Sequence, residues 1–397
     1  MKRILASAVL MATMGWACDV CGQTKSALSD KQVAEAFEGI ANEKTPGLAV
    51  MVKQDGRVLF ERGYGVKELR TGSRIDTKTN FRLASVTKQF TAMAVMLLVH
   101  DKKLRYEATV GEIFPEFPEY GKKISVRQLL NHTGGLPDYE DLMNAVEMGA
   151  IEKKANGPIW SPEKQIQDAE VLQLLEKEKK GKFVPGTKWD YSNSGYVVLG
   201  LIAAKVSGKT YGEFLHDRIF APLKMTDTIV FQKGKNTVPN RAYGHSWVDV
   251  THSSHGPYLE ETDQSETSAT LGDGGIYSSV DDLSKWDDAL RNHMLLSEEE
   301  MKPALEPAKF GGAENAVLPD DAPAGLRGAP VEYGFGWFLD AYKGHERMWH
   351  YGDTMGFKTA IQRLTKDRLT VIVLCNRTDL DPGALATHVV DLYLAGR

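Results

Sequence analysis

Strand-forming sequence lies at both ends of this chain, and helical patterns fill the region between them. Near the start, Asp55-Gly56 is a hairpin signal between two such segments. Residues from about 100 to 265 show mostly helical periodicity and loops. The order predicts an α+β fold, with one antiparallel sheet built from the N- and C-terminal segments and flanked by the terminal helices. The expected strands are residues 47–53, 57–64, 334–340, 359–364 and 369–376.

The same pattern divides the chain into lobes. We expect residues 23–84 and 266–397 to form an α/β lobe, and residues 85–265 to form a mainly helical inserted lobe. A cleft between two such lobes is a usual place for a ligand, so we expect the active site there. Residues 303–330 are rich in Ala, Gly and Pro and predict a long surface loop.

Residues 1–22 have the composition of an export signal. Lys2 and Arg3 precede an apolar run that ends near Ala17, and a small-residue cleavage site follows. The run is too short and too polar in places to span a bilayer, and no later stretch is long enough. We therefore expect a periplasmic or extracellular protein without a membrane span. A lipid anchor on Cys18 stays open, although Gly15 stands where a large aliphatic residue is preferred.

Charge and motif content exclude several classes of function. The formal net charge is −5 and no long basic run occurs, which argues against nucleic-acid binding. The chain has no Walker loop, dinucleotide fingerprint or Gly-x-Ser-x-Gly elbow. His345 and His350 are five residues apart, not four as in a zinc-binding helix, which argues against a metal site. His245, His252 and His255 lie in polar sequence and are expected to be solvated.

Three short motifs occur in one order along the chain: Ser85-Val86-Thr87-Lys88, Tyr191-Ser192-Asn193 and His350-Tyr351-Gly352. Each is common alone, since Ser85 and Asn193 also fit simple helix caps. Ser161-Pro162-Glu163-Lys164 repeats the first pattern in a polar context. Taken together and in this order, however, the three motifs indicate a serine nucleophile, basic groups beside it, and a strand that holds the substrate.

The residue types match that chemistry. Ser85 precedes an apolar, buried helix, and Lys88 returns to the same face one turn later. Burial disfavours a charged ammonium, so Lys88 is a candidate base near neutral pH. Tyr191 is a candidate phenolate or proton carrier, and Asn193 offers a donor and an acceptor to a substrate amide. His350 is a candidate donor to a substrate carboxylate, and Gly352 would let a substrate backbone lie close to the strand.

These segments resemble the penicillin-recognising serine hydrolases: class C β-lactamases, D-alanyl-D-alanine carboxypeptidases, and related esterases and D-amino-acid peptidases. The likeness runs from about residue 30 to the end and is strongest around the Ser85 and His350 motifs. Further matching segments are Leu129–Pro137, Pro222–Thr228 and Gly274–Ser279. In this order His132-Thr133-Gly134 is a fold motif and not the third catalytic motif.

The resemblance implies a β-lactamase/transpeptidase-like fold and acyl transfer through an ester on Ser85, with no metal and no organic cofactor. Lys88 and Tyr191 would take and return its proton, and the backbone N–H groups of Ser85 and Asp353 would form the oxyanion hole. Class C β-lactamases carry Lys-Thr-Gly where this chain has His-Tyr-Gly, so a carboxylate anchor is weakened.

We therefore expect an exported serine hydrolase, acting as a monomer on an amide or ester such as a D-amino-acid peptide. A class C-like β-lactamase is the alternative within the enzymes. From another class, a catalytically weak protein that binds peptidoglycan or β-lactams also fits the motifs.

Overall fold

The computed structural model describes residues 28–152, 158–249, 256–310, 317–318, 328, 330 and 332–396. The expected export signal with Cys18, the histidines at 252 and 255, and most of the expected loop that ends at residue 330 lie outside them. Among the described helices, none has the length and apolar character needed to cross a membrane.

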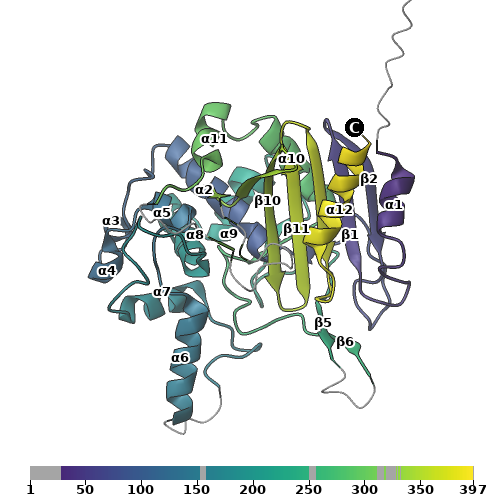
Figure 1. The fold of residues 1–397 in the computed structure, drawn as a ribbon. Coiled ribbons are helices and arrows are strands. Elements are labelled where there is room, and N and C mark those ends of the chain that lie inside the picture. Colours follow the sequence, from purple (N-terminus) through teal and green to yellow (C-terminus); the bar gives the residue numbers. More distant parts are fainter. Residues whose placement is uncertain are drawn as a thin grey trace, which may run out of the picture.

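A seven-stranded antiparallel sheet forms the centre of the molecule (Figure 1). Its strand order is β2-β1-β12-β11-β10-β9-β8, so the first strands of the chain pair directly with the last. This arrangement confirms the α+β fold predicted from the two ends of the sequence. The bounds are β1 Leu48–Gln54, β2 Arg57–Tyr64, β8 Glu332–Tyr333, β9 Phe338–Tyr342, β10 His345–Thr354, β11 Phe357–Leu364 and β12 Leu369–Cys375.

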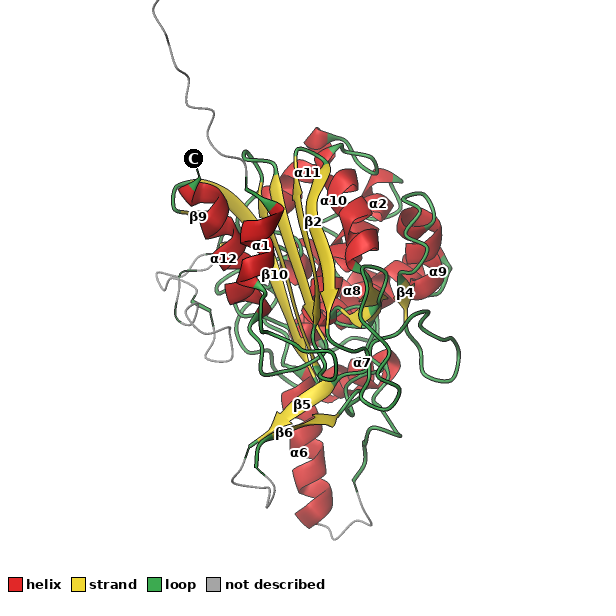
Figure 2. Ribbon diagram, turned by 90° about the vertical axis from the view of Figure 1, so that its right-hand side faces the viewer, coloured by secondary structure: helices red, strands yellow, loops and turns green. Residues whose placement is uncertain are grey.

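Helices cover both faces of this sheet (Figure 2). α1 (Asp30–Ala36) and α12 (Pro382–Ala395) lie on one face, while α2 (Lys88–His100) and α10 (Val280–Arg291) lie on the other. Because side chains alternate along a strand, β1 and β12 supply residues to both cores. Buried Cys375 belongs to the core under α12, as expected for a packed small hydrophobe.

The middle of the chain forms a mainly helical region beside the sheet (Figure 1). α8 (Asn193–Ser207) is an apolar helix buried over most of its length, with Ser192 as its N-cap and Gly208 as its C-cap, where a φ of 71° suits glycine. The remaining helices are α3 Val110–Ile113, α4 Glu119–Lys122, α5 Val126–Leu130, α6 Tyr139–Glu152, α7 Asp168–Lys177, α9 Tyr211–Leu215 and α11 Glu298–Leu305, with short turns at Ala84–Thr87 and His216–Phe220.

Short strands that the sequence did not indicate also occur. A three-stranded sheet joins β3 (Phe81–Arg82), β7 (Ile276–Ser278) and β4 (Ile229–Val230). A separate hairpin consists of β5 (His245–Val248) and β6 (Tyr258–Glu261). The expected loop also starts later, because α11 continues through Pro303 to Leu305.

The expectation that His245 is solvated is wrong. His245 is fully buried, and its backbone N–H donates to the carbonyls of Gly356 and Asn376. The polar neighbourhood in the sequence misled the prediction, because the packing of the hairpin against distant chain segments is not a local property.

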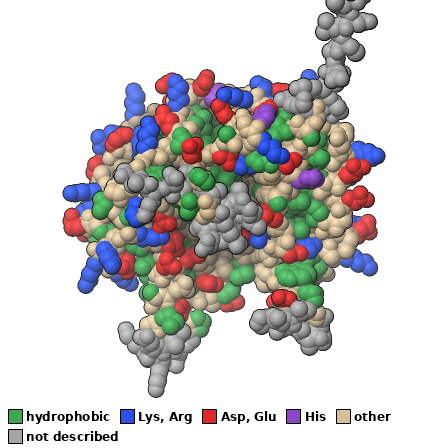
Figure 3. All heavy atoms as spheres, in the orientation of Figure 1, with side chains coloured by type: hydrophobic (Ala, Val, Ile, Leu, Met, Phe, Trp, Pro, Cys, Tyr) green, Lys and Arg blue, Asp and Glu red, His purple; other side chains and the backbone are tan. Residues whose placement is uncertain are grey.

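On the face seen in Figure 3, Lys and Arg side chains are mixed with Asp and Glu.

Candidate active site

Ser85 lies in a strained turn between β3 and α2. The turn, residues Ala84–Thr87, is a 3₁₀ helix, and Ala84 before the serine has a φ of +48°. This conformation is unfavourable for a residue with a side chain and persists only where surrounding contacts enforce it. Here Leu83 is held from both sides: its N–H donates to Ile276 O at 2.8 Å, and Thr359 Oγ1 donates to its carbonyl at 2.8 Å. The serine is therefore placed by strands from two sheets.

Lys88 is fully buried at the start of α2. Its Nζ donates to Ser85 Oγ at 3.0 Å, Asn193 Oδ1 at 2.8 Å and Asp273 O at 3.0 Å, which uses all three donors of an ammonium group. Burial lowers the pKa of Lys88 to about 8, against the opposing effect of nearby carboxylates, of which Asp273 is the strongest. The neutral amine is thus accessible near neutral pH.

Tyr191 completes the contacts of the serine. Its phenol interacts with the Ser85 side chain, and Lys88 Nζ lies 4.9 Å from the ring centroid. Burial raises the pKa of Tyr191 well above its ordinary value. Of the two states considered from the sequence, phenol and phenolate, the geometry favours the neutral phenol, which can relay a proton between the serine and a leaving group.

The His132 segment supports the turn that carries Tyr191. The His132 ring packs against the Tyr191 ring with centroids 4.4 Å apart, and Ser192 N–H donates to His132 Nδ1 at 3.1 Å. Asp190 N–H donates to the His132 carbonyl at 3.0 Å. Burial lowers the pKa of His132 well below its ordinary value, so the ring is neutral. These contacts agree with a structural role for His132-Thr133-Gly134.

His350 is buried with both ring nitrogens engaged by the protein. Nδ1 lies 2.7 Å from the carbonyl of Tyr351, which can only accept, so Nδ1 carries the proton. Nε2 then accepts from the Tyr333 hydroxyl at 3.0 Å. Burial lowers the pKa of His350 to about 3. The structure thus gives the histidine a Tyr333 partner that the sequence did not indicate, and its contact with a substrate carboxylate stays a prediction.

Gly352 brings β10 close to the nucleophile. A Cβ at this position would lie 2.2 Å from Leu83 O and 2.5 Å from Thr359 Oγ1. The space that a Cβ of residue 352 would need is therefore filled by the backbone that precedes Ser85, and the approach of a substrate backbone to Gly352 stays a prediction. Asp353 follows at the exposed end of the strand, 3.6 Å from Lys358, and its place in the oxyanion hole stays a prediction.

Sequence reasoning missed the acidic surroundings of Lys88. Asp138 and Glu140 flank the first residue of α6, whose Tyr139 hydroxyl donates to Asp273 Oδ2 at 3.2 Å. The Gly272-Asp273-Gly274-Gly275 run was available as a signal, since it indicates a close backbone approach. The structure confirms that approach: a Cβ on Gly272 would lie 2.3 Å from Tyr196 O.

The lowered pKa of Lys88 predicts a pH profile. If the neutral amine accepts the serine proton, kcat/KM should rise with pH and level off above about 8, because protonation below that value removes the base. Tyr191 should add no fall below pH 10, since its pKa lies above that value. Steady-state kinetics across this range provides the measurement, and a profile that is flat from pH 6 to 9 would contradict the assignment.

Comparisons with known proteins agree with this geometry. The Beta-lactamase family profile matches residues 32–395. The chain belongs to the Beta-lactamase family. It is therefore an enzyme of the serine-hydrolase type, with the fold that the resemblance implied.

Two curated relatives and two solved structures show the range within the family. Penicillin-binding protein 4* of Bacillus subtilis is 30% identical over 88% of this chain and 72% of its own length. A D-aminopeptidase of Cereibacter sphaeroides is 26% identical over 83% of this chain, which spans only 57% of that protein.

Of the structures, D-amino acid amidase from Ochrobactrum anthropi has a TM-score of 0.70 and 24% identity, with 92% of this chain and 98% of that chain covered. The octameric penicillin-binding protein homologue from Pyrococcus abyssi has the same score and identity, over 92% and 76% of the two chains.

Proposed function

We propose that this Beta-lactamase family enzyme hydrolyses amides or esters of D-amino acids that carry a free amino group. The observation that carries the hydrolase assignment is the contact of Ser85 Oγ with both Lys88 Nζ and the Tyr191 phenol. The names of the D-aminopeptidase and the D-amino acid amidase suggest the substrate class.

The proposed reaction uses only residues of this chain. Ser85 Oγ attacks the substrate carbonyl, and its proton passes to the Lys88 amine. Tyr191 relays a proton to the leaving amine or alcohol as the tetrahedral intermediate collapses to an ester on Ser85. Backbone N–H groups of Ser85 and Asp353 stabilise the oxyanion. The loss of one such donor typically costs about 3 kcal/mol of transition-state stabilisation. Water then attacks the ester by the reverse proton path.

The charges near Lys88 support a substrate with a free amine. Asp273 is 6% exposed, and its Oδ1 has no hydrogen-bond partner among the described residues. Burial, followed by repulsion from Asp138 and Asp273, raises the pKa of Glu140 to about 7, and burial also raises the pKa of Asp138. Lys88 cannot pair with these carboxylates directly, because its three donors are used. A substrate ammonium would supply the missing cation.

The neutral state of His350 argues against an efficient β-lactamase. With its pKa near 3, the ring supplies no positive charge to the carboxylate of a penicillin or cephalosporin. Losing a charge-assisted contact costs about 1.5–3 kcal/mol, or roughly one to two orders of magnitude in binding. We therefore place β-lactam turnover second to the hydrolysis of D-amino acid amides.

A paired-substrate assay tests the proposal. D-alanine p-nitroanilide should be hydrolysed about 10-fold to 100-fold faster, as kcat/KM, than its N-acetyl derivative, because only the former carries the ammonium. Asp273→Asn should remove most of that difference, while the neutral Asn leaves the N-acetyl rate nearly unchanged. Preference for the N-acetyl substrate would contradict the amine assignment. Rapid turnover of a chromogenic cephalosporin would favour the β-lactamase, and stable labelling by penicillin without turnover of any substrate would favour a binding protein.

Export and assembly belong to the proposal as well. The signal-like residues 1–22 lead us to propose an exported protein, which fractionation of expressing cells would test. We also propose that the protein is a monomer. Because one structural neighbour is an octamer, light scattering should be used to test this oligomeric state.

A further inference from the structure

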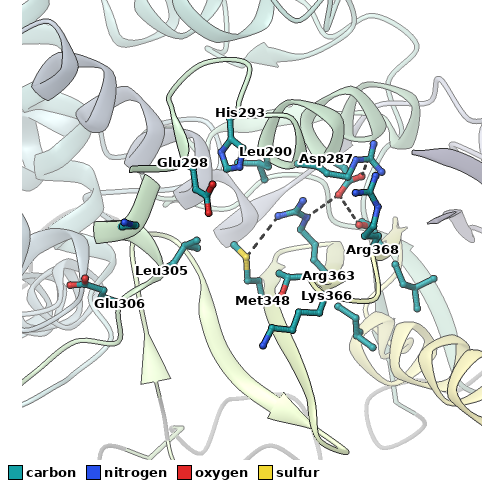
Figure 4. Close-up of a pocket in the computed structure, with 16 residues that line it drawn as sticks. Asp287, Leu290, His293, Glu298, Leu305, Glu306, Met348, Arg363, Lys366 and Arg368 are labelled. Carbon is teal, nitrogen blue, oxygen red and sulfur yellow. Dashed lines mark hydrogen bonds and ion pairs between the residues drawn. The ribbon is translucent and has the colours of Figure 1, made fainter. Parts of the chain in front are cut away.

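A cavity of about 570 Å³ lies at the far end of the sheet from Ser85 (Figure 4). It is bounded by α10, α11 and the ends of β10, β11 and β12. Met348 of its wall and Gly352 beside the nucleophile are on the same strand, four residues apart, so about 13 Å separates them along β10. The cavity is therefore distinct from the proposed catalytic site but shares a strand with it.

The guanidinium of Arg363 lies between Met348 and Asp287 in the wall of this cavity (Figure 4). Arg363 is only 9% exposed, and its Nε donates to Asp287 Oδ1 at 2.9 Å. Its Nη1 lies 3.8 Å from Met348 Sδ, a weak acceptor. Within the described part of the chain, Asp287 supplies the only oxygen that accepts from this group. A guanidinium has five N–H donors, so four of those on Arg363 have no oxygen acceptor among the described residues.

Asp287 contacts Arg363 through one oxygen. The Thr370 hydroxyl also donates to this Oδ1, at 2.6 Å, while Arg291 Nη2 lies 3.9 Å from Oδ2 and pairs more closely with Asp288. The pairing of Asp287 with Arg363 is therefore monodentate. Because a buried guanidinium is stabilised by bidentate pairing with an oxyanion, the geometry leaves room for a second anion on Arg363.

The wall contains five Lys or Arg residues and three Asp or Glu residues, with Arg363 and Asp287 included in these counts. The other four cations pair with acids that do not line the cavity: Arg368 with Asp55 at 2.7 Å, Lys366 with Glu346 at 2.5 Å, Arg291 with Asp288, and Lys302 with Glu299. Arg363 is therefore the cation whose nearest acid, Asp287, belongs to the wall itself.

Apolar side chains also line this cavity. Leu290, Leu305 and Met348 line the cavity beside the guanidinium, and Leu305 is 41% exposed although it is a leucine. An inorganic ion would use only the cations, whereas a ligand with an apolar group would also cover these side chains. The volume falls in the range of small-molecule sites.

We propose that this cavity binds a small organic anion, a carboxylate attached to an apolar group. The carboxylate pairs with the free N–H groups of Arg363, and the apolar group packs on Leu290, Leu305 and Met348. Such a ligand supplies the acceptors that the buried guanidinium lacks and covers the exposed part of Leu305.

Calorimetric titration of the full chain tests the proposal, with 3-phenylpropionate as the probe. Binding should be at least about 10-fold tighter than that of the uncharged 3-phenylpropanamide or of inorganic phosphate. Ser85→Ala and reaction of Ser85 with a fluorophosphonate should leave it unchanged. Equal binding of acid and amide, equal binding of phosphate, no binding at millimolar concentration, or loss of binding after reaction with the fluorophosphonate would each overturn the proposal.

Two variants separate the site from general stability. Arg363→Gln should weaken binding at least about 10-fold, but it also removes a partner of Asp287 and can unfold the chain. Leu305→Trp fills the mouth of the cavity, keeps every ion pair and should weaken binding to a similar extent, whereas Leu69→Trp at an equally exposed position elsewhere should not. Wild-type affinity in folded Leu305→Trp would contradict the assignment.

Discussion

Ser85→Ala should lower kcat/KM by about three to six orders of magnitude, because it removes the atom that forms the covalent intermediate. Lys88 Nζ donates to this hydroxyl and the Tyr191 phenol interacts with it, so both proposed proton-transfer groups are directed at Ser85. The same variant should lose all labelling by a fluorescent penicillin or a fluorophosphonate. Gel fluorescence and mass spectrometry of the labelled peptide are the measurements.

Ser161→Ala is the matched control for this experiment. Ser161 stands in the other Ser-x-x-Lys motif, but its hydroxyl lies in an exposed turn and donates to Glu163 Oε2 at 2.9 Å. The variant should keep both turnover and labelling. If the label instead maps to Ser161 or Ser192, the assignment of the nucleophile is wrong.

Lys88→Met and Tyr191→Phe should each lower kcat by about 10²- to 10⁴-fold, with a much smaller change in KM, because both groups move protons in the transition state. Since both contact the same serine hydroxyl, they act as a unit. The double variant should therefore be scarcely slower than the slower single variant. Losses that add on a logarithmic scale would contradict a shared proton path.

Lys53→Met controls for the loss of a buried lysine. Lys53 is 2% exposed, and burial lowers its pKa to about 8, as for Lys88. Its Nζ lies 2.6 Å from Asp288 Oδ2 and donates to Ser284 O at 2.9 Å, so Lys53 links β1 to α10. This variant should lower the free energy of unfolding in a denaturant titration while kcat stays near the wild-type value. A large fall in kcat would show that kcat in this protein responds to any buried charge.

Local signals predicted the parts of the fold that depend on neighbouring residues. Asp55 and Gly56 adopt positive φ angles of 50° and 82° in the expected hairpin between β1 and β2. Ser29 and Gln32 form the expected capping box. Ser279 caps α10, whose end at Arg291 also agrees with the sequence. Each of these features is decided within about four residues, which is the range that a single sequence reveals.

The features that were missed depend on residues far apart in the chain. The small sheet of β3, β7 and β4 consists of strands of two or three residues, too short to give a period of two. The Tyr333 hydroxyl that meets His350, and the Asp273 carbonyl that accepts from Lys88, belong to segments that no local pattern links to them. The three motifs did indicate which groups meet at Ser85, while their roles stay predictions.

The pairing of β1 with β12 has a consequence for synthesis of the protein. Leu48 of β1 lies opposite Cys375 of β12. More than three hundred residues must therefore be translated after Leu48 before β1 can pair with β12. Until then β1 carries an unpaired edge, a known template for aggregation, and such distant contacts also slow folding. A polypeptide released before Leu369 would lack a central strand of the sheet, with β1 on one side and β11 on the other left open. Premature termination near the end of this chain should therefore yield insoluble protein, even though α2 and α8 would be complete.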